Sequence, residues 1–169
     1  CINSDGSRIA ISGTQEGGNN RVRVYDYSNS SWTQVGSDIN GEAAYTASGD
    51  SIAMNSDGSK IAIGAPFNDG TTGNTDDNRG HVRVYDYKIP TTDEWSNGNI
   101  IKEGDTTQQA DKSYWTQVGS DIDESVYNWG ARYGVDPASR SGSTVAMSGD
   151  GTIIAIGSPN YHYYDDGEN

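Results

Sequence analysis

The sequence predicts an all-β fold built from repeated four-stranded antiparallel units. The first observation is a heptapeptide, RVRVYDY at residues 21–27, that returns with one change as HVRVYDY at residues 81–87. The second is the block WTQVGSDI, which occurs unchanged at residues 32–39 and 115–122. The third is composition, because 22 glycines and an apolar content of 32% are typical of a turn-rich chain and not of a helical one. The chain is therefore a tandem repeat of short strands and turns.

The strands follow from turn signals and from alternation of side chains. Asp-Gly pairs are turn signals, and each is followed by a β-branched Ile-containing run that predicts a strand. These pairs lie at residues 5–6, 57–58 and 150–151. In the heptapeptide, Val22 and Val24 alternate with polar and aromatic residues, which predicts a strand with one buried face. The Trp-Thr-Gln-Val run, ended by glycine, and the run at residues 51–54 predict the other two strands of the unit.

One small sheet of this kind buries too little apolar surface to be stable alone, so the units must stack. Four-stranded units that recur every ~40–50 residues are typical of a β-propeller. We expect three strands of a first blade in residues 1–47, a second blade in residues 48–140 and the start of a third in residues 141–169. About two and a half blades leave the ring incomplete, since propellers have about four to eight. Either the chain is a piece of a longer protein, or copies of it complete one another's blades. The long spacers at residues 88–114 and 123–140 are expected to be insertions.

Two known repeats resemble these blocks. Residues 51–64, followed by residues 82–86, are similar to a Trp-Asp (WD) repeat in which tyrosine replaces tryptophan. Residues 57–66, followed by residues 80–85, resemble the FG-GAP repeats of integrin α-chain propellers, and the likeness extends to residues 156–159. These resemblances cover nearly every block outside the insertions. They imply a propeller fold and leave the ligand open.

Calcium is the one cofactor that the resemblance suggests. FG-GAP repeats often bind it through an acidic loop, but the corresponding residues 54–61 lack the first and last aspartates of that pattern, so we expect no calcium there. A second oxygen-rich loop follows, and oxygen atoms are the ligands that calcium prefers. Its candidate metal ligands are Asp69, Asp76 and Asp77. The spacing fits no loop motif, so a solvated acidic loop is the alternative.

The insertions contain aromatic residues that could bind a sugar. An aromatic ring covers the apolar face of a sugar while neighbouring polar groups bind its hydroxyls. The candidates are Trp95, Tyr127, Trp129 and Tyr133. The alternative is that these rings pack the insertions onto the scaffold. Trp32 and Trp115 recur in register, and we expect them to be blade-packing residues.

Candidate catalytic groups are few. His81 occupies the position that Arg21 has in the other copy, which argues against a unique chemical role. The sequence shows no Ser/His/Asp order, no metal-binding His/Cys cluster and no phosphate-binding loop. A pair of carboxylates could serve a glycosidase, and those available are Asp93, Glu94, Asp123 and Glu124. Every acidic protein offers such pairs, so we expect no enzymatic activity.

Charge and composition restrict the partners. A formal net charge of −13 argues against nucleic acid and anionic membranes, because both are polyanions. No run approaches the about 20 apolar residues of a membrane helix, so we expect no membrane insertion. The single cysteine, Cys1, cannot form an internal disulfide. It could pair with a segment outside this sequence or carry a lipid.

The expected function is that of an extracellular, secreted or cell-surface binding module. Asn29-Ser30-Ser31 is an N-glycosylation sequon in a predicted turn. The first hypothesis is an adhesion or structural scaffold, with protein ligands or copies of itself as partners, the copies completing one another's blades through open edges. The alternative is a carbohydrate-binding module that uses the insertion aromatics on glycan ligands.

Overall fold

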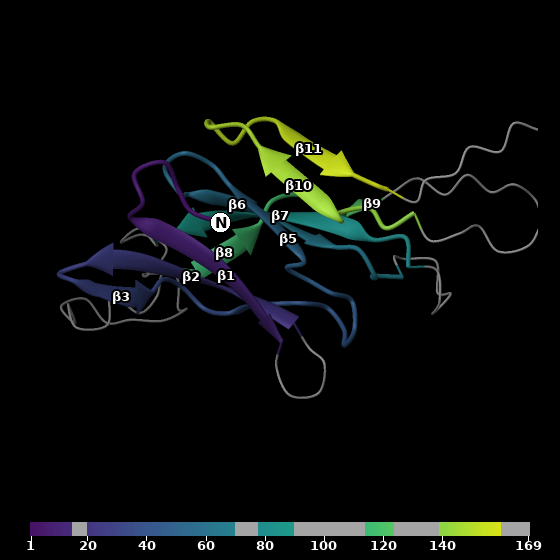
Figure 1. The fold of residues 1–169 in the computed structure, drawn as a ribbon, viewed down its shortest axis with the longest axis horizontal. Helices are drawn as coiled ribbons and strands as arrows, with labels where there is room; N and C mark the ends of the chain where they lie inside the picture. Colours follow the sequence, from purple (N-terminus) through teal and green to yellow (C-terminus); the bar gives the residue numbers. More distant parts are fainter. Residues whose placement is uncertain (15–19, 70–77, 90–113, 124–138, 160–169) are drawn as a thin grey trace, which may run out of the picture.

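The structure, a computed structural model, describes residues 1–14, 20–69, 78–89, 114–123 and 139–159. Within these ranges the chain forms antiparallel β-sheets and no helix, which confirms the all-β prediction (Figure 1). No helix in this part of the chain is therefore long and apolar enough to cross a membrane. In chain order the strands are β1 (Arg8–Thr14), β2 (Asn20–Ser28), β3 (Ser31–Gln34), β4 (Ile39–Asn40), β5 (Ser51–Met54), β6 (Lys60–Ala65), β7 (His81–Lys88), β8 (Tyr114–Gln117), β9 (Ile122–Asp123), β10 (Thr144–Met147) and β11 (Ile154–Gly157).

The strands form three sheets that lie side by side in chain order (Figure 1). The first has the order β1-β2-β3, with β4 also pairing with β2. The second has the order β5-β6-β7-β8, with β9 also pairing with β7, and the third is the hairpin β10-β11. The second sheet is the middle layer because one apolar cluster joins it to the first sheet and another joins it to the third. The described sheets do not close into a ring.

The sequence repeat is also a repeat of strand register. Ile9 pairs with Tyr25 between β1 and β2, and the equivalent Ile61 pairs with Tyr85 between β6 and β7. The alternation within β2 is confirmed, since Val22 and Val24 are fully buried whereas the residues between and after them are partly exposed. The register therefore places equivalent side chains of the first two sheets in equivalent positions.

Each of these two sheets also contains a short strand that the sequence analysis did not expect. In the first sheet, β3 and β4 pair with different parts of β2, and a turn at Gly36 separates them. In the second sheet, β8 and β9 pair with β7 in the same way around Gly119. Both glycines have positive φ, 72° and 73°, which side chains rarely adopt. Asp38 and Asp121 follow these turns and are thereby directed toward the central strand.

The same backbone hydrogen bond links each sheet to the next. The backbone N–H of Ser4 donates to the carbonyl of Ser56 at 3.0 Å. The N–H of Ser56 in turn donates to the carbonyl of Gly149 at 2.8 Å. These three residues are equivalent, because each immediately precedes an Asp-Gly turn. The sheets are therefore stacked by one repeated step.

A repeated close approach accompanies this hydrogen bond. A Cβ added to Gly49 would lie 2.9 Å from Cγ2 of Val22 in the first sheet. A Cβ added to the equivalent Gly142 would lie 3.1 Å from Cγ2 of Val82 in the second sheet. A side chain at either glycine would displace a buried valine of the preceding sheet, which explains why the small residue recurs.

The last Asp-Gly turn gives a pH-dependent prediction. The Asp150 carboxylate accepts hydrogen bonds from the Ser148 hydroxyl at 2.6 Å and from the Thr152 backbone N–H at 3.0 Å. These bonds lower the pKa of Asp150 from 3.8 to about 2. A carboxyl group whose pKa is lower in the folded state contributes stability that is complete above the unfolded pKa and disappears as pH falls through the folded pKa.

We therefore expect Asp150→Ala to lower Tm by a few degrees at neutral pH. Because the contribution of Asp150 is lost between pH 3.8 and about 2, the Tm values of the variant and the wild type should converge over that interval. Thermal unfolding followed by circular dichroism at a series of pH values measures this difference. A Tm difference that is the same at pH 7 and at pH 2 would contradict the role given to the ionised carboxylate.

Candidate functional site

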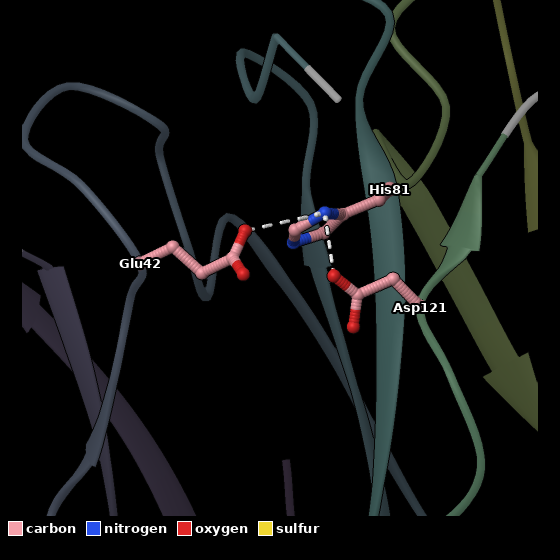
Figure 2. A group of neighbouring side chains, drawn as sticks. All are labelled: Glu42, His81 and Asp121. Atoms are coloured by element: carbon pink, nitrogen blue, oxygen red, sulfur yellow. Dashed lines mark ion pairs between the residues drawn. The ribbon is translucent and has the colours of Figure 1, made fainter. Parts of the chain in front are cut away.

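Glu42, His81 and Asp121 converge where the first and second sheets meet (Figure 2). His81 is the first residue of β7, Asp121 lies in the turn before β9, and Glu42 follows β4 of the first sheet. His81 Nδ1 lies 3.8 Å from Glu42 Oε2 and 3.7 Å from Asp121 Oδ2. Asp123 of β9 adds a third carboxylate oxygen, 3.8 Å from the same nitrogen. One carboxylate of the first sheet and two of the second thus surround a single imidazole nitrogen.

The imidazole is buried while the cluster opens to solvent on one side. The His81 side chain is 4% exposed, whereas that of Glu42 is 42% exposed. The three oxygen atoms around Nδ1 are beyond ordinary hydrogen-bond length. Among the described residues, the imidazole has no hydrogen bond. Neither imidazole nitrogen is among the fully buried polar atoms without a partner, so the ring nitrogens remain in contact with solvent.

Neighbouring donors hold the carboxylates in place. Arg83 binds Asp121 through two parallel bonds, Nε to Oδ1 at 2.9 Å and Nη2 to Oδ2 at 3.1 Å. Gln117 Nε2 donates to Asp121 Oδ1 at 2.6 Å. Arg83 also forms an ion pair with Glu42, whose Oε2 accepts a hydrogen bond of 3.0 Å from Asn68 Nδ2. The bidentate contact gives the site a fixed geometry.

The protonation states follow from burial and from these contacts. Burial lowers the pKa of His81 and outweighs the opposing effect of Asp121 and Asp123. For Asp121, burial is the largest single effect and raises the pKa, but hydrogen bonds from Gln117 and Arg83 together lower it below the ordinary value. The site at neutral pH therefore combines a neutral imidazole with an ionised carboxylate.

The first sheet contains the same framework with one exchange. Arg23 binds Asp38 through two bonds of 2.8 and 3.0 Å, as Arg83 binds Asp121. Gln34 Nε2 donates to Asp38 Oδ1 at 2.8 Å, as Gln117 does in the second sheet. Arg21 occupies the position of the histidine, and its Nη1 donates to Asp38 Oδ2 at 3.0 Å. In the first sheet the Asp38 carboxylate thus contacts two guanidinium groups, whereas Asp121 contacts only that of Arg83 among the described residues.

A second exchange accompanies the first. Arg21 pairs across the strands with Asn40, whereas His81 pairs with Asp123 at the equivalent positions. The second sheet therefore has one permanent cation fewer and one carboxylate more, and Glu42 adds a further negative charge. Imidazole nitrogen and carboxylate oxygen are ligands of divalent transition metals, so these residues could hold such an ion.

The structure describes some of the site residues that the sequence analysis singled out and not others. Asp69 is half-buried, and its Oδ1 accepts a hydrogen bond of 3.2 Å from the Asn78 backbone N–H. Asn29 is exposed in the turn between β2 and β3, where a sequon is accessible. The proposed sugar-binding, metal-binding and carboxylate-pair residues that lie outside the described ranges are Trp95, Tyr127, Trp129, Tyr133, Asp76, Asp77, Asp93, Glu94 and Glu124.

Sequence reasoning did not single out Glu42 or Asp121, and it argued against a unique role for His81. One signal in the sequence could have found the site. Where the first copy has Arg21 and Asn40, the second has His81 and Asp123, and in each sheet these two residues face each other across neighbouring strands. Glu42 carried no such signal, because its contact depends on how the first sheet packs on the second.

In comparisons with known proteins, no family model and no curated protein sequence matched the chain. The functional argument therefore depends on the residues and their geometry.

Proposed function

We propose that the chain is a non-enzymatic, extracellular repeat module of the β-propeller type, in which each sheet is a blade that packs on the next. Support comes from the inter-sheet hydrogen bond that recurs from Ser4 to Ser56 and from Ser56 to Gly149. The same inter-sheet hydrogen bond could attach further blades to the stack. The sheets serve as a scaffold, and the variable loops between them are available for adhesion or structural contacts.

The observation that carries the proposal is the different burial of two equivalent tryptophans. Trp115 in the second sheet is 8% exposed, and its indole N–H donates to the Val35 carbonyl of the first sheet at 3.1 Å. Its ring packs on Tyr87 at a centroid distance of 5.4 Å. Trp32 packs on Tyr27 at 5.0 Å in the same way, yet it is 43% exposed. The sequence analysis expected both tryptophans to be packing residues, and only Trp115 is covered.

The exposed Tyr27 and Trp32 lie on a face of the first sheet whose equivalent in the second sheet is covered by a neighbouring sheet. Arg8 of the first sheet lies over the Tyr87 ring at 4.5 Å, so the equivalent face of the second sheet is covered by charge and apolar contacts together. On the first sheet, Trp32 and Tyr27 have no described sheet over them. We propose that a sheet of the same repeat, supplied by a second copy of the chain, packs on this face.

The test is self-association in solution. Light scattering over a range of concentrations should show dimers or larger assemblies of the wild type. Trp32→Ser should shift the chain toward the monomer by removing the aromatic contact area, whereas Tyr45→Ser should not, although Tyr45 is 80% exposed. A wild type that is monomeric at every concentration, or assembly that is insensitive to Trp32, would overturn the proposal.

A further inference from the structure

We propose that Glu42, His81 and Asp121, with Asp123 beside them, form a binding site for a divalent transition metal between the first and second sheets. The site goes beyond the scaffold function, and it does not depend on self-association. It also differs in location from the acidic loop around Asp69 that the sequence suggested.

The spacing of the ligand atoms fits one shared ion. Ligand atoms bound tetrahedrally to a metal at about 2.0–2.2 Å lie about 3.3–3.6 Å from one another. His81 Nδ1 lies 3.7–3.8 Å from the oxygens of Glu42, Asp121 and Asp123. One atom from each of Glu42, His81 and Asp121 can be chosen so that all three lie within 4.8 Å of one another. Small movements of the exposed Glu42 side chain would bring the set to bonding geometry.

The buried histidine points to a ligand independently of the carboxylates. Its side chain is 4% exposed, it has no hydrogen bond within the described ranges, and Nδ1 is directed into the group of oxygens (Figure 2). An imidazole nitrogen that is neutral and buried can give its lone pair to a metal ion. A bound metal would thus give the imidazole a fixed partner in place of solvent.

The first sheet has a positive charge at the position equivalent to His81. There the guanidinium of Arg21 lies against Asp38 and provides a positive charge. In the second sheet, Glu42, Asp121 and Asp123 bring three carboxylates, and the permanent cation that contacts two of them is Arg83. A divalent ion would take the place of the guanidinium and balance the two additional carboxylates.

The donor set selects the kind of metal. Calcium takes six to eight oxygen ligands, and magnesium keeps several waters, so neither is suited to a buried imidazole. A set of one nitrogen and two or three carboxylate oxygens is suited to zinc. We therefore take zinc as the probe ion.

The experiment is a zinc titration of the purified chain by calorimetry, combined with thermal unfolding. All variants carry Cys1→Ser, because the exposed N-terminal thiol could bind zinc by itself. We expect one zinc ion per chain and a Tm that rises by several degrees when zinc is in excess. His81→Arg should weaken binding at least about 10-fold. It places at this position the residue that the first sheet already has, so the fold should be retained.

Arg21→His is the matched control. It places a histidine at the equivalent position beside Asp38, where the cross-strand neighbour is Asn40, so no second zinc site should appear. Glu42→Gln removes a charge from an exposed ligand and should also weaken binding while leaving the fold intact. Zinc binding that is unchanged in both His81→Arg and Glu42→Gln, or a wild type whose Tm does not respond to zinc, would overturn the proposal.

Discussion

Replacing Val84 with aspartate is expected to destabilise the chain by about 3–5 kcal/mol, because the change places an unpaired charge between two sheets. Val84 is 7% exposed and lies in the cluster that joins the second sheet to the third. Its neighbours there are apolar, and they include Ala53, Ala62 and Val145. None of them can hydrogen-bond a carboxylate through its side chain, so the cost of burial is not offset.

Ile153→Asp is the control for this change. Ile153 is also apolar, but it is 69% exposed and the new charge would remain in water. We expect its effect to stay within about 0.5 kcal/mol. Urea denaturation followed by circular dichroism measures both variants. If Val84→Asp unfolds at the same urea concentration as the wild type, Val84 is not a core residue.

Gly64→Ala should separate the second and third sheets. A Cβ at this position would lie 2.0 Å from the Gly142 carbonyl oxygen and 2.4 Å from the Ser51 Oγ. Ser51 Oγ itself donates to the same carbonyl at 2.7 Å, so the methyl group would also displace a hydrogen bond between the sheets. Since the closest obstacle is backbone, relaxation requires one sheet to move, and we expect a loss of about 3 kcal/mol.

The same substitution elsewhere in a strand serves as the comparison. Gly13 lies in β1, and a Cβ added there would meet no atom within 4 Å. Gly13→Ala should therefore leave stability unchanged or raise it slightly, because alanine restricts the unfolded chain more than glycine does. Equal unfolding midpoints for Gly64→Ala and Gly13→Ala would show that the third sheet does not approach Gly64 closely.

Local sequence was sufficient for the longer strands because their signals are local, whereas the two-residue strands β4 and β9 were missed. The alternation around Val22 and Val24 and the Asp-Gly turns depend only on neighbouring residues, and the strands they predict are present. The burial of Trp32 could not be predicted in this way. Its sequence block is identical to that of Trp115, and only the position of each sheet in the stack makes one ring buried and the other exposed.

The candidate site could be predicted from the sequence only in part. The contact of Arg83 with Asp121 belongs to one sheet and repeats that of Arg23 with Asp38, so a comparison of the two copies could have predicted it. Glu42 reaches the site from the preceding sheet, and no pattern within one repeat predicts such a contact. The stacking of two sheets therefore had to be known before the cluster could be recognised.

The hydrogen bond that recurs between sheets also determines how the chain loses its structure. In a stack of sheets, each sheet is stabilised by its interfaces with the neighbouring sheets. An outer sheet has one such interface, and an inner sheet has two. Among the described sheets, the first sheet and the hairpin of β10 and β11 are outer layers, whereas the middle sheet is coupled on both sides. We therefore expect opening to begin at the hairpin, which has the fewest strands, and the amide protons of β6 and β7 in the middle sheet to exchange last.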